Sequence, residues 1–565
     1  MKVCSASLRR MVASSLILAI TIIPMPLAMA QGGAKTISDV EGFDPLPESP
    51  MEKARREGTA INLSLTEATK IALENNIAIA IQNIQEENTR LNVSSARAAY
   101  DPTLSISALS FSRTVGYTTD FFGNLADNTS DTQNLSGVTV RKRFLWGGNA
   151  SVGLTGLNRR DISNSIATPT YSSQISLSYT QPLLRNLRID SQRNQIRIAN
   201  LNLETSEINF KNQVTTVIAQ VQQQYWALVL AIRQYEIQRN SVNLSRMNLR
   251  DNRKRLEVGT VPQINVLQAE ANLARTEVSL FSSENSILQA QNNLRQTMSG
   301  DRTSEIWKKF IVPTDLPDFV EYKIDLETAI ASALQKRSEI ETARLNLKQN
   351  EWSQQLNREN KKWGLDINVS YNRSGNAIPI DGNPPILKPG TTDQYYSRYP
   401  QGGLPSAIKS IFSEPGYTFQ VQFNITAPIW QRSTDIQIAQ NEIQRRNQLT
   451  QLKQTEQNIM VEVTNAVQTL QSNRLQLTTA AKARELSQQQ YENEQKRYDV
   501  GMTQNNVLLD ALNAVGSAEV SELQALINYK QAIVTLQRAM NTLLESSQFT
   551  LARGTATDNI PKFKY

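Results

Sequence analysis

The sequence contains no histidine, and its only cysteine is Cys4. Without these side chains the chain can form no internal disulfide, no zinc site of imidazole and thiolate ligands, and no histidine-based acid–base chemistry. Aromatic residues are also scarce, at 6%, and all apolar residues together make up 39%. We therefore expect no enzyme, no metal and no cofactor, and narrow buried seams along helices instead of one large core.

The first 30 residues are typical of a secretory signal peptide. Three basic residues precede an apolar run over residues 11–23, and Ala28 to Ala30 provide a cleavage site of small residues. Cleavage leaves 535 residues without cysteine and lowers the net charge from +7 to +4. The apolar run is shorter than the roughly 20 residues of a membrane-spanning helix, and no later run reaches that length. We expect no transmembrane helix.

Acidic and basic residues are interspersed along the chain, with 52 of the first kind and 59 of the second. Nucleic-acid binding would require basic residues gathered into a patch, so we expect no nucleic-acid partner. No glycine-rich loop of the phosphate-binding kind follows a predicted strand, and no carboxylate cluster suggests a metal.

The chain contains an internal repeat. A shift of 261 residues aligns the apolar and small residues that follow Leu65 with those that follow Leu326. A shift of 242 aligns RLEVG, residues 255–259, with RYDVG, residues 497–501, so the first half carries 19 additional residues. Two similar halves predict a duplicated fold.

Each half begins with a helix, over 66–98 and 325–361, because apolar residues recur there with a period near 3.6. In the first of these helices the stripe is Ile77, Ile81, Ile84 and Leu91. Alternating segments at 103–112 and 364–372 then predict strands that have one face in water and one in lipid.

A return strand in each half ends at a proline, Pro182 or Pro428, where the missing amide would stop sheet pairing and allow a turn into a helix. Between the strands of the second half, residues 374–416 show no pattern and predict an exposed outer loop.

Long helices are expected over 186–258 and 433–499, each about 100 to 110 Å at 1.5 Å per residue. After Gly259 and Gly501 the chain turns back into helices over 261–298 and 503–544. The two shorter helices of a half, laid end to end, match the long one. Each half is therefore predicted to be an antiparallel helical layer with strands at one end, and that end lies in the membrane.

Two strand pairs give only four strands per chain, whereas closed membrane sheets need about eight. Several copies must then share one barrel. The strand and proline signatures, the paired VG turns and the duplicated short, long and short helices resemble the TolC family of outer-membrane efflux proteins. The resemblance extends over Leu65 to Leu544.

The resemblance implies an α+β membrane protein: a homotrimer whose β-barrel, about four strands per protomer, continues into a long α-helical barrel with a mixed equatorial belt. It implies an exit duct of a tripartite efflux or type I secretion system in the Gram-negative outer membrane. Partners would be outer-membrane lipid, a periplasmic adaptor, and an inner-membrane pump or ABC transporter. The expected divisions are the signal peptide 1–30, equatorial segments 31–64, 300–324 and 546–565, and repeats 65–299 and 325–545.

One segment departs from the family pattern. Residues 135–158 look like an extra hairpin that turns at Gly147 and Gly148. It either adds two strands to the barrel or folds as decoration on the surface, and we favour decoration.

The helical turns are the candidate docking site. A glycine where a helix reverses is by itself only a C-cap, but the aligned pair matches the adaptor-contacting tips of the family. The predicted docking residues are Leu256, Val258, Gly259, Tyr498, Val500 and Gly501.

The resemblance also implies a periplasmic gate, and its candidate residues are Asn265, Tyr498 and Asp510. Tyr498 matches the tyrosine of the family's closing network, and Asp510 matches one ring of aspartates that selects cations. Asn265 replaces the network's aspartate and Thr503 its arginine, so amide contacts or packing would hold the tip closed. The alternative for Asp510 is an ordinary solvated carboxylate on a helix.

Two other functions remain open from the sequence. A trimeric coiled-coil surface stalk or adhesin would present the loops outward, but would need stricter heptads and no duplication. A soluble periplasmic scaffold would require that the alternating segments lie outside the membrane.

Overall fold

The computed structural model describes residues 48–546 except 116–117, 120–124, 127–128, 164–165, 302, 316, 378–385, 388–393, 396–400 and 414. The predicted signal peptide, the segment 31–47 and the tail from residue 547 lie outside the described residues. The chain divides into two units at residue 48, and the second, Ser49–Tyr565, is described here.

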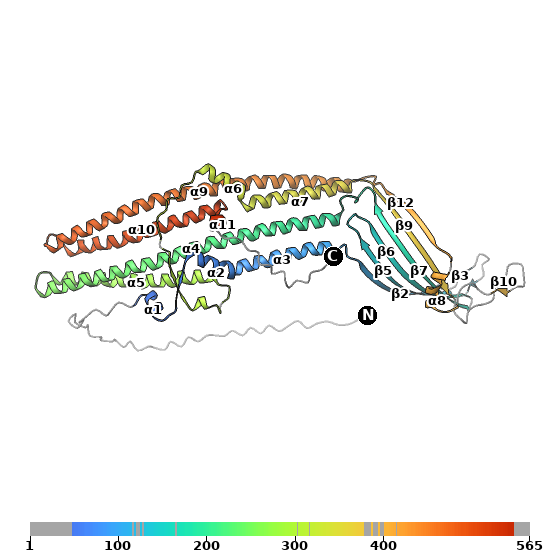
Figure 1. The fold of residues 1–565 in the computed structure, drawn as a ribbon, viewed down its shortest axis with the longest axis horizontal. Coiled ribbons are helices and arrows are strands. Elements are labelled where there is room, and N and C mark those ends of the chain that lie inside the picture. The colour runs from blue at the N-terminus through green and yellow to red at the C-terminus, as the bar shows by residue number, and fades with distance from the viewer. Residues whose placement is uncertain are drawn as a thin grey trace. The chain divides into compact units, whose positions relative to one another are not determined.

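Helices make up most of this unit (Figure 1). They are α1 (Pro50–Arg56), α2 (Leu65–Asn75), α3 (Ile77–Ala98), α4 (Ser191–Glu257), α5 (Gln263–Met298), the 3₁₀ helix η2 (Glu305–Trp307), α6 (Leu326–Lys336), α7 (Ser338–Asn360), α8 (Leu404–Ser413), α9 (Arg432–Asp499), α10 (Asn505–Ala539) and α11 (Leu543–Ser546). Within the described part of the chain, every helix is too short or too polar to cross a lipid bilayer.

The strands are β1 (Ala60–Leu63), β2 (Thr103–Val115), β3 (Thr118–Thr119), β4 (Leu125–Ala126), β5 (Thr129–Arg143), β6 (Asn149–Ser163), β7 (Ile166–Pro182), β8 (Phe310–Pro313), β9 (Gly364–Ala377), β10 (Ile386–Leu387), β11 (Gln394–Tyr395) and β12 (Thr418–Thr426). Six of them form one antiparallel sheet in the order β12-β9-β7-β6-β5-β2. Strands β1 and β8 pair in parallel beside the helices, in the segments expected to be equatorial.

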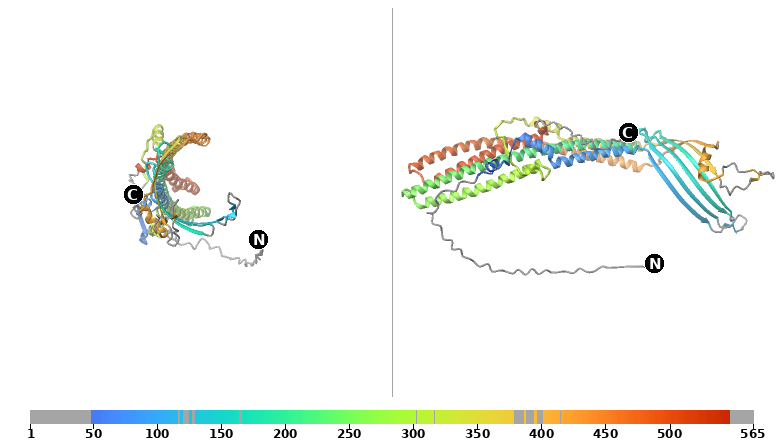
Figure 2. Two further views of the ribbon diagram at one scale, coloured as in Figure 1. Left: turned by 90° about the vertical axis from the view of Figure 1, so that its right-hand side faces the viewer. Right: turned by 60° about the horizontal axis from the view of Figure 1, so that its bottom comes forward.

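The helices lie side by side in one curved layer, with the sheet at one end (Figure 2). Near the sheet the neighbours run in the order α3, α4, α7, α9, and toward the opposite end in the order α5, α4, α10, α9. In both stretches α4 joins the first half to the second, through α7 near the sheet and through α10 toward the opposite end.

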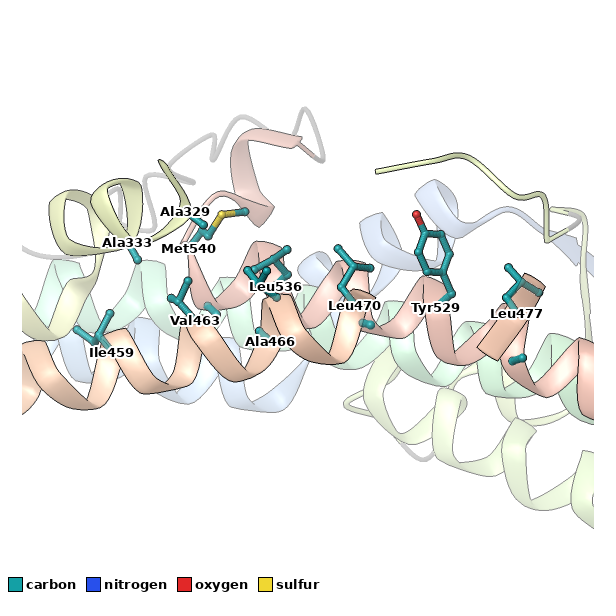
Figure 3. Close-up of a cluster of buried hydrophobic side chains, with 14 of the residues drawn as sticks. Ala329, Ala333, Ile459, Val463, Ala466, Leu470, Leu477, Tyr529, Leu536 and Met540 are labelled. Atoms are coloured by element: carbon teal, nitrogen blue, oxygen red, sulfur yellow. The ribbon is translucent and has the colours of Figure 1, made fainter. Parts of the chain in front are cut away.

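A narrow seam of apolar side chains joins the helices of the second half (Figure 3). The seam of α9 repeats every three, four or seven residues, and Ile459, Val463 and Leu470 are almost wholly buried in a cluster with residues of α6, α7 and α10. Tyr529 of α10 is part of this seam, and its hydroxyl donates to the carbonyl oxygen of Val320 (3.2 Å). This is one of the narrow buried seams that the composition predicts.

The first helix of each half is broken, where a single continuous helix was predicted. Asn76 separates α2 from α3, and Arg337 separates α6 from α7; both have extended ψ angles, of 127° and 130°. These two breaks are 261 residues apart, which equals the repeat shift. The duplication therefore includes the kink as well as the helices.

The predicted stripe of α3 does not face the core of its own chain. Ile77, Ile81, Ile84 and Leu91 are between 47% and 65% exposed, while Ile79 and Val93 on the other face are buried. The prediction of a buried stripe is wrong within one chain, because α3 lies at the edge of the layer and contacts only α4 on that side.

The sheet has six strands, and the prediction of four per chain is wrong. The segment 135–158 forms most of β5 and β6, which are paired along their lengths with each other and with β2 and β7. The preference for surface decoration is wrong for the same reason: thirteen consecutive residue pairs join β5 to β2, and fifteen join β6 to β7.

The two faces of the sheet differ in polarity. On one face the apolar residues Val140, Val152, Leu177, Tyr371 and Phe419 lie in register on five neighbouring strands. On the other face stand Ser, Thr, Asn and Gln residues, such as Ser176, Asn372 and Thr418. Most of the apolar side chains are exposed in the single chain.

The segment 374–416 is not a patternless loop. Strand β9 continues to Ala377, and α8 packs over the far end of β6, β7 and β9. It lies on the face that carries the apolar residues, against Gly156, Ser173 and Gly375, and Ala407 and Ile411 are buried there. Residues 378–385, 388–393, 396–400 and 414 of this predicted loop lie outside the described residues.

Candidate functional site at the helical tips

Two helical hairpins end at the side of the layer opposite the sheet (Figure 1). In the first, Gly259 has a φ of 74°, and in the second Gly501 has a φ of 77°, the left-handed region that favours glycine. The amide of Thr260 donates to the carbonyl oxygen of Arg255 (2.8 Å), and that of Met502 to Arg497 (2.8 Å). Both turns are thus the glycine C-cap that the aligned VG pairs predict.

The turns present apolar side chains to solvent. Val258 is 72% exposed and Val500 is 67% exposed, at equivalent places in the two hairpins. Nothing lies within 4 Å of the Cβ position of either glycine, so both turns are open on their outer side. Leu256 is half-buried. Paired exposed valines are a small apolar surface available to a partner.

Tyr498 connects the second hairpin to the first. It is 7% exposed, and its hydroxyl donates to Oδ1 of Asn252 on α4 (3.1 Å). The Arg255 guanidinium lies 4.5 Å from the centre of its ring and also pairs with Asp499 (3.4 Å). Burial raises the pKa of Tyr498, against the opposing effect of the Arg255 charge. The phenol is therefore a neutral donor at physiological pH.

Behind Tyr498 lies a group of hydrogen-bonded side-chain amides, here called the tip amide cluster: the half-buried Asn248 and the buried Asn252 and Asn505. Asn252 and Asn505 are at most 1% exposed. Nδ2 of Asn252 donates to Oδ1 of Asn248 (3.0 Å) and of Asn505 (3.3 Å), and Nδ2 of Asn248 donates to Oδ1 of Asn505 (3.1 Å). The cluster joins α4 to α10 and, through Tyr498, to α9.

A second set of amide contacts lies further from the turns. Nδ2 of Asn272 on α5 donates to Oγ of Ser245 on α4 (3.2 Å), and Nδ2 of Asn513 on α10 donates to Oδ1 of Asn272 (3.3 Å). The two sets connect all four helices of the tips through uncharged groups. Buried amides cost far less free energy than a buried carboxylate, provided that they are hydrogen-bonded.

Ion pairs at the tips run mainly within each hairpin. Arg253 pairs with Glu270 (2.7 Å) and Arg246 with Glu277 (2.9 Å), both between α4 and α5. Arg484 pairs with Glu522 (2.5 Å) between α9 and α10. Between the hairpins, the polar contacts of the described residues include the amide and tyrosine hydrogen bonds and the half-exposed Arg255–Asp499 pair.

The structure brings some of the predicted residues together and leaves others apart. Tyr498 lies beside Val500 and Gly501 at one tip, because the three residues are close in the sequence. Among the described residues, Tyr498 bonds to Asn252 and not to Asn265, which is half-buried near the start of α5. Asp510 is exposed on α10, outside the tip amide cluster.

The predicted proline turns lie at the other end of the helices. Pro182 is the last residue of β7, and the next amide, of Leu183, donates to the carbonyl oxygen of Leu365 (2.7 Å). Pro428 follows two residues after the end of β12. Helix α4 then begins after Asp190, whose carboxylate accepts from the Arg193 amide (2.6 Å) as an N-cap.

The tip amide cluster is not recognisable in the sequence. Its only signal was that Asn248 and Asn252 stand four residues apart on the face of α4 that also carries the buried Ser245 and Leu249. In helices rich in Asn and Gln such a pair does not stand out. Asn505, more than 250 residues away in the sequence, becomes a partner only through the packing of the hairpins.

Comparison with protein-family models gives one match, to the family described as outer membrane efflux protein, over residues 68–300 and 329–542. These segments cover more than half of the chain. Comparison with curated protein sequences finds no match.

Several solved structures share the fold. The Campylobacter jejuni CmeC outer membrane channel has a TM-score of 0.59 at 16% identity, with 85% of each chain covered. The outer membrane protein VceC from Vibrio cholerae has a TM-score of 0.58 at 13% identity, covering 84% of this chain and 95% of that one. The open state of the MtrE outer membrane channel of Neisseria gonorrhoeae has a TM-score of 0.54 at 16% identity, covering 85% and 89%.

Proposed function

Because the chain belongs to the outer membrane efflux protein family, whose members are channels and not enzymes, we propose that it is the exit duct of a tripartite efflux or type I secretion system. The protein is located in the Gram-negative outer membrane and extends into the periplasm. The observation that carries the proposal is the sheet, with one face apolar along its strands and the other polar. Such a sheet separates lipid from a water-filled passage.

In this arrangement the sheet crosses the outer membrane and the helices cross the periplasm. The 67 residues of α4 reach about 100 Å at 1.5 Å per residue. The tips then lie deepest in the periplasm, where an inner-membrane partner can reach them. A single path leads from the tips along the helices to the polar face of the sheet.

One chain cannot enclose this path, and the two edges of the layer support a homotrimer. At one edge α3 exposes Ile77, Ile81 and Ile84. At the other edge α9 exposes Ile436, Ile443, Val461, Leu475 and Leu486, which fall on one face of a 3.6-residue helix. Different apolar stripes on opposite edges fit a head-to-tail ring of identical copies.

The tips are the proposed docking site for a periplasmic adaptor, which would connect the duct to an inner-membrane pump or ABC transporter. Val258 and Val500 offer matched apolar contacts, and Leu256, Gly259, Tyr498 and Gly501 shape the turns beneath them. Three copies would present six such turns in a ring, two from each chain.

The gate is proposed to be held closed by neutral groups. The Tyr498 hydroxyl and the tip amide cluster hold the α9–α10 hairpin against α4. Separating the hairpins would break these hydrogen bonds and expose the amides to water, at a net cost of about 0.5 to 1.5 kcal/mol for each bond. Asn265 and Asp510 are proposed to face the passage beside this latch, Asp510 as one carboxylate of a ring of three that attracts cations.

Two experiments test the duct and its partner. Purified protein in a planar lipid bilayer should give discrete channel currents; trimers that never conduct under any condition would favour a surface stalk. Cysteines at Thr260 and Met502, beside the two turn glycines, should crosslink to a periplasmic adaptor in intact cells. The same substitution at Asn83 on the exposed side of α3 is the control, and equal capture there would refute docking at the tips.

A further inference from the structure

The hairpin β5–β6 belongs to the membrane-facing wall of the sheet. Val138 and Val140 of β5 and Val152 and Leu154 of β6 lie on the apolar face and are between 37% and 46% exposed. They stand in register with Ile106 and Leu104 of β2 and with Leu177 and Ile175 of β7. A surface decoration would not continue a lipid-facing band through four strands.

The sheet has two unpaired edges in the described part of the chain, β2 on one side and β12 on the other. Edge amides and carbonyls that face hydrocarbon would have no hydrogen-bond partner, so a membrane sheet must close. Because β2 leads away from the helices and β12 leads back to them, β2 of one copy and β12 of the next would pair antiparallel. Each is therefore the natural partner of the other.

The register within the chain indicates how these edges meet. Residues that lie directly opposite one another on successive strands connect Thr103, the first residue of β2, with Gln420 of β12. The intermediate residues are Arg141, Ser151, Ser178 and Ser370. Gln420 lies six residues before Thr426, the helix-proximal end of β12. The register is therefore displaced by six residues along the strand direction between β2 and β12 of one copy.

Pairing Thr103 of one copy with Thr426 of the next places both helix-proximal strand ends at one level. It also sets Leu104 opposite Ile425 and Ile106 opposite Phe423, apolar face to apolar face. The stagger is then one residue per strand, which corresponds to a strand tilt of about 35° for spacings of 3.3 and 4.8 Å. Membrane barrels have tilts of roughly 35–45°. The strands do lean away from the helix axes (Figure 2).

We propose that β2 pairs with β12 of the neighbouring copy in this register, with the β5–β6 hairpin in the wall, so that three copies close one sheet of eighteen strands. The proposal rests on the trimeric duct proposed above. It replaces the twelve strands that four per chain would give. Since barrel diameter grows roughly linearly with strand number, the outer opening is about half again as wide. A wider opening suits bulkier cargo once the tips are open.

Paired cysteines test the closure directly, because Cys4 is the only cysteine of the chain. Ser107 and Gln422 lie on the polar face and oppose each other in the proposed register. Opposed residues on antiparallel strands have Cβ atoms about 4.5–5.5 Å apart, within reach of mild oxidation or a short thiol crosslinker. The double variant S107C/Q422C should therefore form covalent dimers and trimers in outer membranes.

The control is S107C/T418C, in which the second cysteine is four residues, about 13 Å, further along β12. Crosslinking of the control in place of S107C/Q422C would overturn the register. Trimers that crosslink in neither variant, or that show twelve strands by electron cryo-microscopy, would overturn the closure and leave the duct intact. Protein that is monomeric and does not conduct would refute the proposed function itself.

Discussion

At the scale of single residues, the Tyr498 hydroxyl is the contact whose loss should weaken the closed tips most selectively. Tyr498→Phe keeps the ring beneath Arg255 but removes the donor to Asn252. The buried Oδ1 atom of Asn252 then loses this donor, which costs about 1 to 3 kcal/mol in each chain. We expect a higher open probability in planar bilayers. Tyr491→Phe, two turns earlier on α9, should leave the currents unchanged; equal effects would argue against the latch.

The neutral latch also predicts how opening depends on pH. Burial raises the pKa of Tyr498 above its ordinary value of 10.0, and the charged groups around it are Arg255, Asp251 and Asp499. Because the pKa is raised in the closed state, the closed state keeps its full stability below pH 10. It loses stability only as pH rises through about 10 toward the raised value. Open probability should therefore be flat between pH 5 and 8. A steep change in that interval would mean that a carboxylate holds the tips.

Asp510 tests a different property of the tips, ion selectivity. If three Asp510 carboxylates face one another across the passage, they should attract cations. Asp510→Ala should then shift the reversal potential measured in a salt gradient toward that of a non-selective pore. Glu327→Ala, an exposed carboxylate on α6 far from the tips, is the matched control. An unchanged reversal potential in the Asp510 variant would leave that residue a solvated helix carboxylate.

At the scale of elements, α8 packs closely on β9 because Gly375 has no side chain. A Cβ on Gly375 would overlap the carbonyl oxygen of Ala407, the Ser410 hydroxyl and the amide of Ile411. Two of these are backbone atoms and cannot move aside. Gly375→Ala should therefore lift α8 from the strands and speed tryptic cleavage after Lys409 in reconstituted protein. Gly416→Ala, where nothing lies within 4 Å, is the control, and equal cleavage rates would contradict the packing.

The long elements could be predicted because their patterns are local. Apolar periods of 3.6 and 2 identified the helices and strands, and the aligned VG pairs identified both turns, whose glycines have φ angles of 74° and 77°. The breaks at Asn76 and Arg337 were missed because the apolar pattern continues across them. Asn76 caps α3 through its side chain, which is a readable signal, whereas Arg337 makes no side-chain cap to α7.

The candidate site was predictable only in part, for a related reason. Tyr498 and the turn residues follow from position along the chain. The partner of Tyr498 does not, because Asn252 is 246 residues away and the register between α4 and α9 decides which amide it meets. The hairpin β5–β6 was assigned to the surface because the family pattern has four strands. Its alternating valines, however, are typical of strands within the sheet.

At the scale of the whole molecule, one chain supplies too few strands for a closed barrel whether it has four or six. Neither four nor six strands make a closed sheet of the usual minimum of eight. The structure adds that both edges of the helical layer are apolar. What looked like a core stripe on α3 is instead an exposed edge, with side chains between 47% and 65% exposed.

Assembly of the copies should depend on the exposed apolar stripe of α3. Ile81 of α3 is 60% exposed in one chain, and Ile81→Glu would bury a charge if α3 packs against α9 of a neighbouring copy. An unpaired buried charge costs several kcal/mol, repeated at three interfaces, whereas the fold of the single chain loses almost nothing. Asn83→Glu adds the same charge on another face of the exposed helix. In detergent, light scattering should give monomers for Ile81→Glu and trimers for Asn83→Glu, both with unchanged helical circular dichroism. Trimers in both variants would remove α3 from the interface.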